Sequence, residues 1–261
     1  DLAKTAVLIE QTWPQLRRNR QEATVLTWMK QLPEQYIQTR PLLSVIYAWV
    51  LLDSGQLETV EQYLHVAESG LEHAAAAGSS LQTLPALITN ARAYYAKAIG
   101  DVAATIKYAQ EALHLLPPHD YYERGPAAAF LGLAHWDSGD LEAAYGNFAD
   151  GLAALQKGGG NLSALGGQSI LAAIRIEQGR LRDAAILYER GLQMAATQGI
   201  PLPIATADLH RGLAELHYEW NDFAAADEQL RLSKMQGERT GLAGDRLRWC
   251  LAQSKIEQAQ G

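Results

Sequence analysis

The sequence has a single cysteine, Cys250, so it can form neither an internal disulfide nor a cysteine-based zinc site. No apolar run approaches the ~18 residues that suggest a membrane span. The first residues also lack the basic-then-apolar pattern of a secretory signal. The net charge is −7 and no Lys/Arg cluster stands out. This disfavours direct contact with nucleic acid, which depends on cation–phosphate pairs. Together these features predict a cytoplasmic protein without a membrane segment.

Motifs for catalysis or cofactor binding are also missing. The glycine run at 158–160 follows no expected strand and precedes no Lys-Ser/Thr pair, so it predicts a linker and not a phosphate-binding loop. His210 and His217 are seven residues apart, whereas metal ligands on one helix pair at closer spacing. Cys250 has no recognisable base, so we expect a buried structural residue. We predict no enzymatic activity, no metal and no cofactor; an all-helical enzyme is the least favoured hypothesis.

What the sequence does contain is a short turn motif that recurs along the chain. In each copy a Gly, or once an Asn, follows a helical stretch. A polar residue and then an apolar residue come directly after it. Successive motifs are 45, 39, 40, 42 and 40 residues apart. Their central residues are Gly55, Gly100, Gly139, Gly179, Asn221 and Gly261. A period near 40 predicts a repeat protein of stacked helical units.

The chemistry of the motif predicts a helical hairpin at each turn. Glycine just past a helix adopts the left-handed conformation at little cost, and asparagine is the next best residue, which explains Asn221. Asp101, Asp140 and Asp222 follow directly and can cap the next helix. Because one helix ends where the next begins, the two run antiparallel. Small residues fall seven positions before each turn, where two helices must approach: Ala48, Ala93, Gly132, Ala172 and Ala214.

We expect an all-α fold, since no segment shows the sustained alternation of a strand. Helical hairpins with small residues at their contacts and Gly in their turns resemble the tetratricopeptide repeat over nearly the whole chain. The resemblance implies a right-handed superhelix of about six tandem tetratricopeptide-like hairpins in a single domain, 1–261. The three successive glycines predict a flexible joint at 158–166. The expected divisions are a partial first repeat at 1–40, repeats at 41–80, 81–120, 126–160, 165–200 and 204–241, and the first helix of a truncated last repeat at 243–261.

Several segments narrow the family further. They lie in the first and middle thirds of the chain, and the resemblance rests on their residues. They read Asn-Arg-Gln-Glu-Ala (19–23), Leu-Pro-Glu-Gln (32–35), Thr-Arg-Pro-Leu-Leu (39–43), Tyr-Ala-Trp (47–49), Ser-Gly-Gln-Leu-Glu (54–58), Gly-Asp-Val-Ala-Ala (100–104) and Leu-Gly-Leu-Ala-His-Trp-Asp-Ser-Gly-Asp-Leu-Glu-Ala-Ala (131–144). The region that they resemble follows the nucleotide-binding part of the MalT-like, LuxR-type ATP-dependent transcriptional activators.

This resemblance implies a place in a longer regulator. In that family an ATPase module comes first, a superhelical sensor second and a helix-turn-helix DNA-binding domain last. The sensor binds an inducer, a sugar in the best-known member, and so regulates ATP-dependent oligomerisation. We therefore expect a signal-sensing and protein-interaction domain. Its partners would be a small-molecule inducer and/or a protein, including the ATPase module of the same regulator. The alternative is a free-standing tetratricopeptide scaffold that binds a peptide segment of a protein partner. Self-association stays open.

The candidate binding residues follow from the geometry of such repeats. The first helix of each hairpin lines the concave face, which is the usual binding surface. Asn90, Tyr94 and Lys97 share one helical stripe by their spacing, and aromatic rings beside polar groups suit a sugar or another small polar ligand. The other interpretation is a solvated face with salt bridges between repeats. The groove candidates are Trp49, Asn90, Tyr94, Lys97, Trp136, Asp208, Arg211, Glu215 and Tyr218.

Overall fold

The computed structural model describes residues 2–76, 83–198, 203–237 and 243–260, and every regular element in these ranges is an α-helix. This confirms the expected all-α class. Within the same ranges, no helix is long and apolar enough to cross a bilayer. The chain divides into two compact units, 1–163 and 164–261. The assignment of the whole chain to one domain stays a prediction, and each unit is described by itself.

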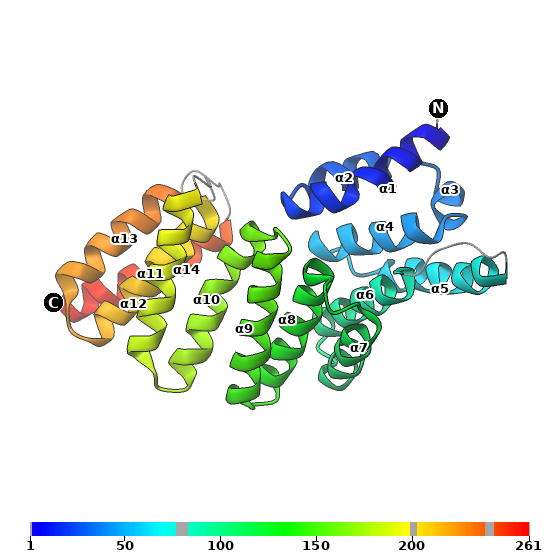
Figure 1. Cartoon of the computed structure of the whole chain (residues 1–261). Coiled ribbons are helices and arrows are strands. Elements are labelled where there is room, and N and C mark those ends of the chain that lie inside the picture. The colour runs from blue at the N-terminus through cyan, green and yellow to red at the C-terminus, as the bar shows by residue number, and fades with distance from the viewer. Residues whose placement is uncertain (1, 77–82, 199–202, 238–242, 261) are drawn as a thin grey trace. The chain divides into compact units, whose positions relative to one another are not determined.

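Unit 1 consists of an N-terminal group of helices followed by antiparallel hairpins (Figure 1). The hairpins pair α4 with α5, α6 with α7 and α8 with α9. In addition α4 packs against α6, and α6 against α8, so these first helices form a continuous layer. The helices are α1 (Leu2–Arg18), α2 (Glu22–Met29), α3 (Glu34–Gln38), α4 (Pro41–Asp53), α5 (Val60–Ala76), α6 (Leu84–Ala98), α7 (Val102–Leu115), α8 (Tyr121–Asp137) and α9 (Leu141–Lys157).

Unit 2 continues the same pattern. Helix α12 packs against α11, α13 and α14, and α13 also contacts α14. A small core of Ala214, Ala226, Leu230, Ala252 and Ile256 joins these last helices. The helices are α10 (Asn161–Glu177), which begins just before the unit boundary, α11 (Leu181–Gln198), α12 (Pro203–Glu219), α13 (Phe223–Gly237) and α14 (Ala243–Gln260).

The recurring turn adopts the predicted conformation at every described position. Each central residue has a positive φ, and the next residue's N–H bonds back to a carbonyl five positions earlier, as in a Schellman motif. The aspartates at 101, 140 and 222 accept a hydrogen bond from the N–H three residues on, as helix caps do. The φ values are 72° at Gly55, 80° at Gly100, 85° at Gly139, 74° at Gly179 and 59° at Asn221. The sixth expected turn residue, Gly261, lies outside the described residues.

Helices α8 and α9 of unit 1 approach each other closely. A Cβ atom added at Gly132 would lie 2.6 Å from the backbone N of Phe148 and 2.9 Å from the carbonyl O of Ala144. The partner helix contributes the reciprocal case, because a Cβ at Gly151 would lie 2.7 Å from the N of Ala129. The two backbones therefore approach too closely for any side chain, which confirms the expected role of a small residue at 132.

The N-terminal group departs from the repeat pattern. Helix α1 packs against α2 and α4, and it buries one stripe: Ala6, Ile9, Trp13 and Arg17. The turn after α1 resembles the later turns, but its left-handed residue is Arg20, with a φ of 55°. A large hydrophobic cluster spans this group and the first hairpins, and includes Ile9, Ile46 and Leu64. The N-terminal helices are thereby fixed to the repeats by the core itself.

One expectation about local structure is wrong, and another agrees in part with the structure. The predicted joint at 158–166 contains the boundary between the two units, at 163–164, although residues from Asn161 onward belong to α10. Gly158 is also closely packed, since a Cβ there would lie 2.6 Å from the backbone N of Tyr122. Cys250 is exposed and not buried as expected. Its neighbour Trp249 packs against the core of unit 2 instead, and donates its indole N–H to the Leu230 carbonyl at 2.9 Å.

Candidate functional site

The layer formed by α4, α6 and α8, called here the α4–α6–α8 face, carries a row of aromatic rings. Trp49 lies on α4, Tyr94 on α6 and Phe130 on α8, one from each hairpin. The Trp49 and Tyr94 ring centroids are 5.4 Å apart, and those of Tyr94 and Phe130 are 4.9 Å apart. Such offset contacts stabilise beyond the area they bury. The structure thus brings together two of the sequence-predicted residues, Trp49 and Tyr94.

An arginine that the sequence analysis missed occupies this face. The guanidinium carbon of Arg17, from the end of α1, lies 3.9 Å from the Trp49 ring centroid and 5.4 Å from that of Tyr122. Arg17 Nη1 donates to both carboxylate oxygens of Glu123, at 2.9 and 3.0 Å. The side chain is only 6% exposed. Burial lowers the pKa of Arg17, but the Glu123 and Tyr122 contacts outweigh it, so the pKa is raised and the group stays charged.

The neighbouring Arg18 extends this attachment. Its Nε donates to the Gly158 carbonyl at 3.2 Å, beyond the end of α9, and its guanidinium carbon lies 4.6 Å from the Tyr122 ring centroid. Tyr122 therefore lies between the two arginines of α1, within cation–π distance of both. The end of α1 is thereby bound to α4, α8 and the end of α9.

Asn90 and Trp49 both lie in the interior, and not on an open groove. Asn90 is fully buried, and its Nδ2 donates to the Glu123 carbonyl at 2.9 Å. Trp49 is 3% exposed. Within the part of the chain that the structure describes, Asn90 Oδ1 and Trp49 Nε1 are buried polar atoms without a hydrogen-bond partner. Such atoms are costly, and few occur in a folded protein, so they mark this face as a polar site within the core.

Two acidic side chains near the aromatic row, Asp53 and Glu22, have raised pKa values. The hydroxyl of Tyr94 donates to Asp53 Oδ1 at 3.2 Å. Burial raises the pKa of Asp53, and Arg20 and Arg17 offset this only in part. Burial likewise raises the pKa of Glu22, which is 8% exposed and lies 3.9 Å from Arg20. Negative charge is therefore disfavoured at these two positions.

We expect Asp53→Asn to raise the melting temperature at neutral pH. A carboxyl whose pKa is raised on folding holds its proton more tightly in the folded state, so stability falls as pH rises through that pKa. The destabilising contribution is absent below the ordinary pKa of 3.8 and complete above the raised one. The amide oxygen can still accept from Tyr94. Melting curves across pH should therefore show a gain at neutral pH that disappears in acid.

Asp150→Asn is the matched control for this change. Asp150 is exposed on α9, and its replacement alters the net charge equally. We expect no comparable gain from it at neutral pH. A gain at Asp53 that is independent of pH, or is shared by Asp150, would contradict the assignment of the effect to the buried carboxyl.

Lys97 and Trp136 mark the other end of the face. Lys97 Nζ pairs with Asp137 Oδ2 at 3.1 Å, which joins α6 to α8. Both side chains are partly exposed, at 28% and 38%. Trp136 is half-buried on the same turn of α8. The polar stripe predicted on α6 thus runs from buried Asn90, through half-buried Tyr94, to accessible Lys97.

The remaining predicted residues belong to unit 2 and form their own group. Arg211 donates to Glu215 at 2.8 Å and to Asp208 at 3.3 Å, all on α12. Tyr218 packs instead against the core between α12, α13 and α14. Next to the ion pairs, burial and the Glu215 charge raise the pKa of Tyr188 to about 12. The charged stripe is therefore present, and Arg211 pairs with both of its carboxylates within α12.

The histidines of α12 serve separate contacts. His210 Nδ1 lies 2.8 Å from Gln229 Oε1, and His217 Nδ1 lies 3.7 Å from Asp222. Among the described residues, no group of three potential ligands could hold a metal ion. The absence of a metal centre from the whole chain stays a prediction.

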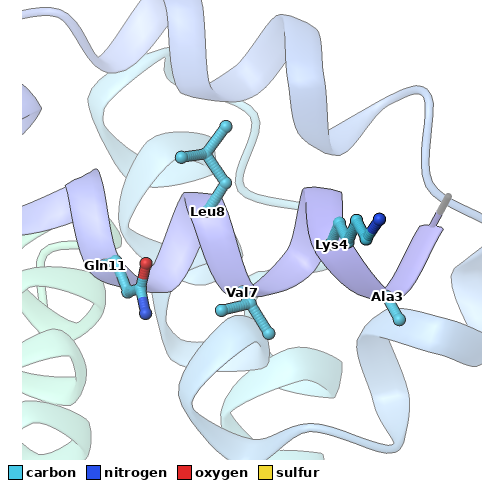
Figure 2. A pocket seen from close by; sticks show the side chains of 5 residues that line it. All are labelled: Ala3, Lys4, Val7, Leu8 and Gln11. Carbon is cyan, nitrogen blue, oxygen red and sulfur yellow. The ribbon is translucent and has the colours of Figure 1, made fainter.

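The outer side of α1 is apolar and accessible. Residues on this side of the helix line a hollow of about 430 Å³. Leu2, Val7 and Leu8 are 45%, 38% and 52% exposed. Figure 2 shows the side chains that line the hollow: Ala3, Lys4, Val7, Leu8 and Gln11. Helix α1 therefore packs on the repeats through a single stripe and leaves the opposite side open.

The fold and this face define a class of protein. Antiparallel helical hairpins with left-handed turn residues, stacked through their first helices, are those of a tetratricopeptide-like repeat protein. Solved structures agree. The apo form of RapI has a TM-score of 0.66 at 10% identity, over 98% of this chain and 72% of that chain. BtubC from P. vanneervenii has a TM-score of 0.64 at 14% identity, over 93% of each chain. Aspartyl phosphate phosphatase F from Bacillus subtilis has a TM-score of 0.67 at 12% identity. The match covers 82% of this chain but only 56% of that chain.

A comparison with family models assigns the chain to one family within this class. A family model described as the MalT-like TPR region matches residues 86–261. Because this match covers more than half of the chain, the chain belongs to the family of MalT-like TPR regions. The match confirms the resemblance, although the matching segments at 19–58 lie before it begins. No curated protein matches the sequence.

Proposed function

We propose that this chain is the signal-sensing and protein-interaction region of a MalT-like, LuxR-type transcriptional activator. Membership of the family of MalT-like TPR regions supports this proposal. The α4–α6–α8 face would carry the binding, because it combines stacked rings, buried polar atoms without partners and an accessible ion pair. In this function the chain has no catalytic step and needs no cofactor.

The regulatory step would be a shift between two arrangements of the regulator. A ligand changes such an equilibrium only through its differential affinity for the two states. An inducer that binds the α4–α6–α8 face more tightly in one of them would favour that state, and with it ATP-dependent oligomerisation. A small polar inducer, such as a sugar, fits rings that stack beside hydrogen-bonding groups.

A thermal-shift screen of the 261-residue chain tests the sensing function. Maltooligosaccharides and a broad metabolite panel are the probes. A bound compound stabilises by roughly 2.7 kcal/mol at a hundredfold excess over its Kd, so we expect a saturable rise in Tm. Lys97→Ala should weaken this shift, because Lys97 lies at the accessible end of the face. Lys107→Ala, on the exposed side of α7, is the control and should leave it unchanged.

A cooperative melt that no compound shifts would contradict small-molecule sensing. The second candidate, a scaffold for a polypeptide segment, would then gain support. One observation favours it, namely that the α4–α6–α8 face already holds a helical segment, the end of α1, through Arg17. Pull-down of the ATPase module of the same regulator would then separate an intramolecular partner from an external one.

A further inference from the structure

The guanidinium group of Arg17 is held in the way that a ligand is held. Trp49 of α4 provides a ring face at 3.9 Å, and Glu123 of α8 accepts two hydrogen bonds. Tyr122 adds a second ring at 5.4 Å. A planar cation stacked on one ring and bonded to a carboxylate is the geometry in which arginine is recognised. The repeats supply the site, and α1 supplies its occupant.

Helix α1 is anchored in the core by Ala6, Ile9 and Trp13, whereas its last turn is held by Arg17. Its buried stripe ends in a charge, where an apolar residue would stabilise a purely structural contact as well or better. Pro14 lies inside the helix and lacks the N–H that would bond to the preceding turn. Leu2, Val7 and Leu8 on its other side are exposed. These features suit a last turn that can leave the face while Ala6, Ile9 and Trp13 stay in the core.

The site also has binding capacity that Arg17 does not use. In the described residues, Trp49 Nε1 and Asn90 Oδ1 are buried without hydrogen-bond partners. Trp49 contacts the guanidinium, and Asn90 donates to the backbone of Glu123. A larger occupant that presents one acceptor and one donor beside its guanidinium would satisfy both atoms. The peptide groups beside Arg17 belong to helix α1, whereas an arginine in an extended partner segment has free peptide groups that can supply both.

We propose that the α4–α6–α8 face contains a guanidinium-binding site whose resident occupant is Arg17 of the chain's own α1. An arginine of a partner segment competes for this site and displaces the last turn of α1. The proposal deepens the proposed function, and it rests on the α4–α6–α8 face being the binding surface. The tethered Arg17 acts at an effective concentration in the millimolar range or above, so a competitor must be strong or abundant.

Chemical rescue in the full chain tests the site. Arg17→Ala should lower the Tm by roughly 5 °C or more, because it leaves the partly buried Glu123 without this partner and opens a cavity beside Trp49. Ethylguanidinium at tens of millimolar should restore part of that loss in Arg17→Ala alone, and ethylammonium at equal concentration should not. Arg182→Ala, at an exposed position of α11, is the matched control and should show no rescue. A response of Arg17→Ala to ethylguanidinium no larger than that of the unaltered chain would overturn the proposal.

If Arg17→Ala does not fold, the unaltered chain decides the question. N-acetyl-arginine amide should accelerate hydrogen exchange in the last turn of α1, whereas the uncharged isostere N-acetyl-citrulline amide should not. Equal effects of the two compounds would refute competition at a guanidinium site. Neither experiment uses an inducer or a partner protein. A failed inducer screen therefore leaves this result intact, and a failed rescue leaves the screen intact.

Discussion

Replacing Glu123 with leucine is expected to destabilise the folded chain by about 3–5 kcal/mol. The change leaves Arg17 buried, at 6% exposure, without the carboxylate that accepts both of its hydrogen bonds. Removing one partner of a buried ion pair has this cost because the remaining charge is uncompensated. Urea denaturation followed by circular dichroism measures the change in the free energy of unfolding. Glu111→Leu, at an exposed position of α7, should change it by no more than about 0.5 kcal/mol.

The double variant Arg17→Leu with Glu123→Leu separates charge from packing. Replacing both members of a buried pair with apolar residues is often neutral. We therefore expect the free energy of unfolding of the double variant to lie within about 1 kcal/mol of that of the unaltered chain, and well above that of Glu123→Leu alone. A double variant as unstable as the single one would show that Glu123 stabilises unit 1 independently of Arg17. The end of α1 would then not be held by this pair.

The second large effect is expected at the contact of α8 with α9. Gly132→Ala should destabilise by about 2–3 kcal/mol, because its Cβ would meet backbone atoms of the partner helix at 2.6 and 2.9 Å. Backbone atoms cannot move aside as the end of a flexible side chain can. The helices would have to separate, and the packing around Phe148 would be lost. The same urea denaturation measures the effect.

Gly146→Ala is the matched control for Gly132→Ala. Gly146 is exposed on α9, and a Cβ there would meet nothing within 4 Å. Alanine favours helix more than glycine does, so this change should stabilise by roughly 0.5–1 kcal/mol. The two glycine-to-alanine changes should therefore have opposite signs. Two changes of the same sign would contradict the close approach of the helices at Gly132.

The sequence was sufficient to predict the hairpins because each turn depends on local chemistry. A left-handed residue at Gly139 and a capping aspartate at Asp140 depend on only a few neighbours. The same locality explains why Asn221 could be assigned to a turn without a glycine. Gly132 could be assigned to a helix contact because the repeat fixed its register relative to the turn.

The site could be predicted only in part, because it depends on contacts between distant residues. The repeat placed Trp49 and Tyr94 on one face, and the structure shows them in contact. What covers Trp49 could not be predicted, since Arg17 and Glu123 are 106 residues apart in sequence. One signal was available: Arg17 continues the spacing of Ala6 and Trp13, so a charge stands at a core position of α1.

Hydrogen exchange in the Glu123→Gln variant tests most directly whether the last turn of α1 is released separately from the rest of unit 1. The neutral amide weakens the bonds to Arg17, and losing charge-assisted bonds of about 1.5–3 kcal/mol corresponds to exchange about tenfold or more faster. We predict this acceleration for the amides of the last turn of α1, which ends at Arg18, while those of α8 and α9 keep their original rates. Unchanged rates in that turn, or equal acceleration throughout unit 1, would show that the turn is an integral part of the fold and not a displaceable occupant of the α4–α6–α8 face.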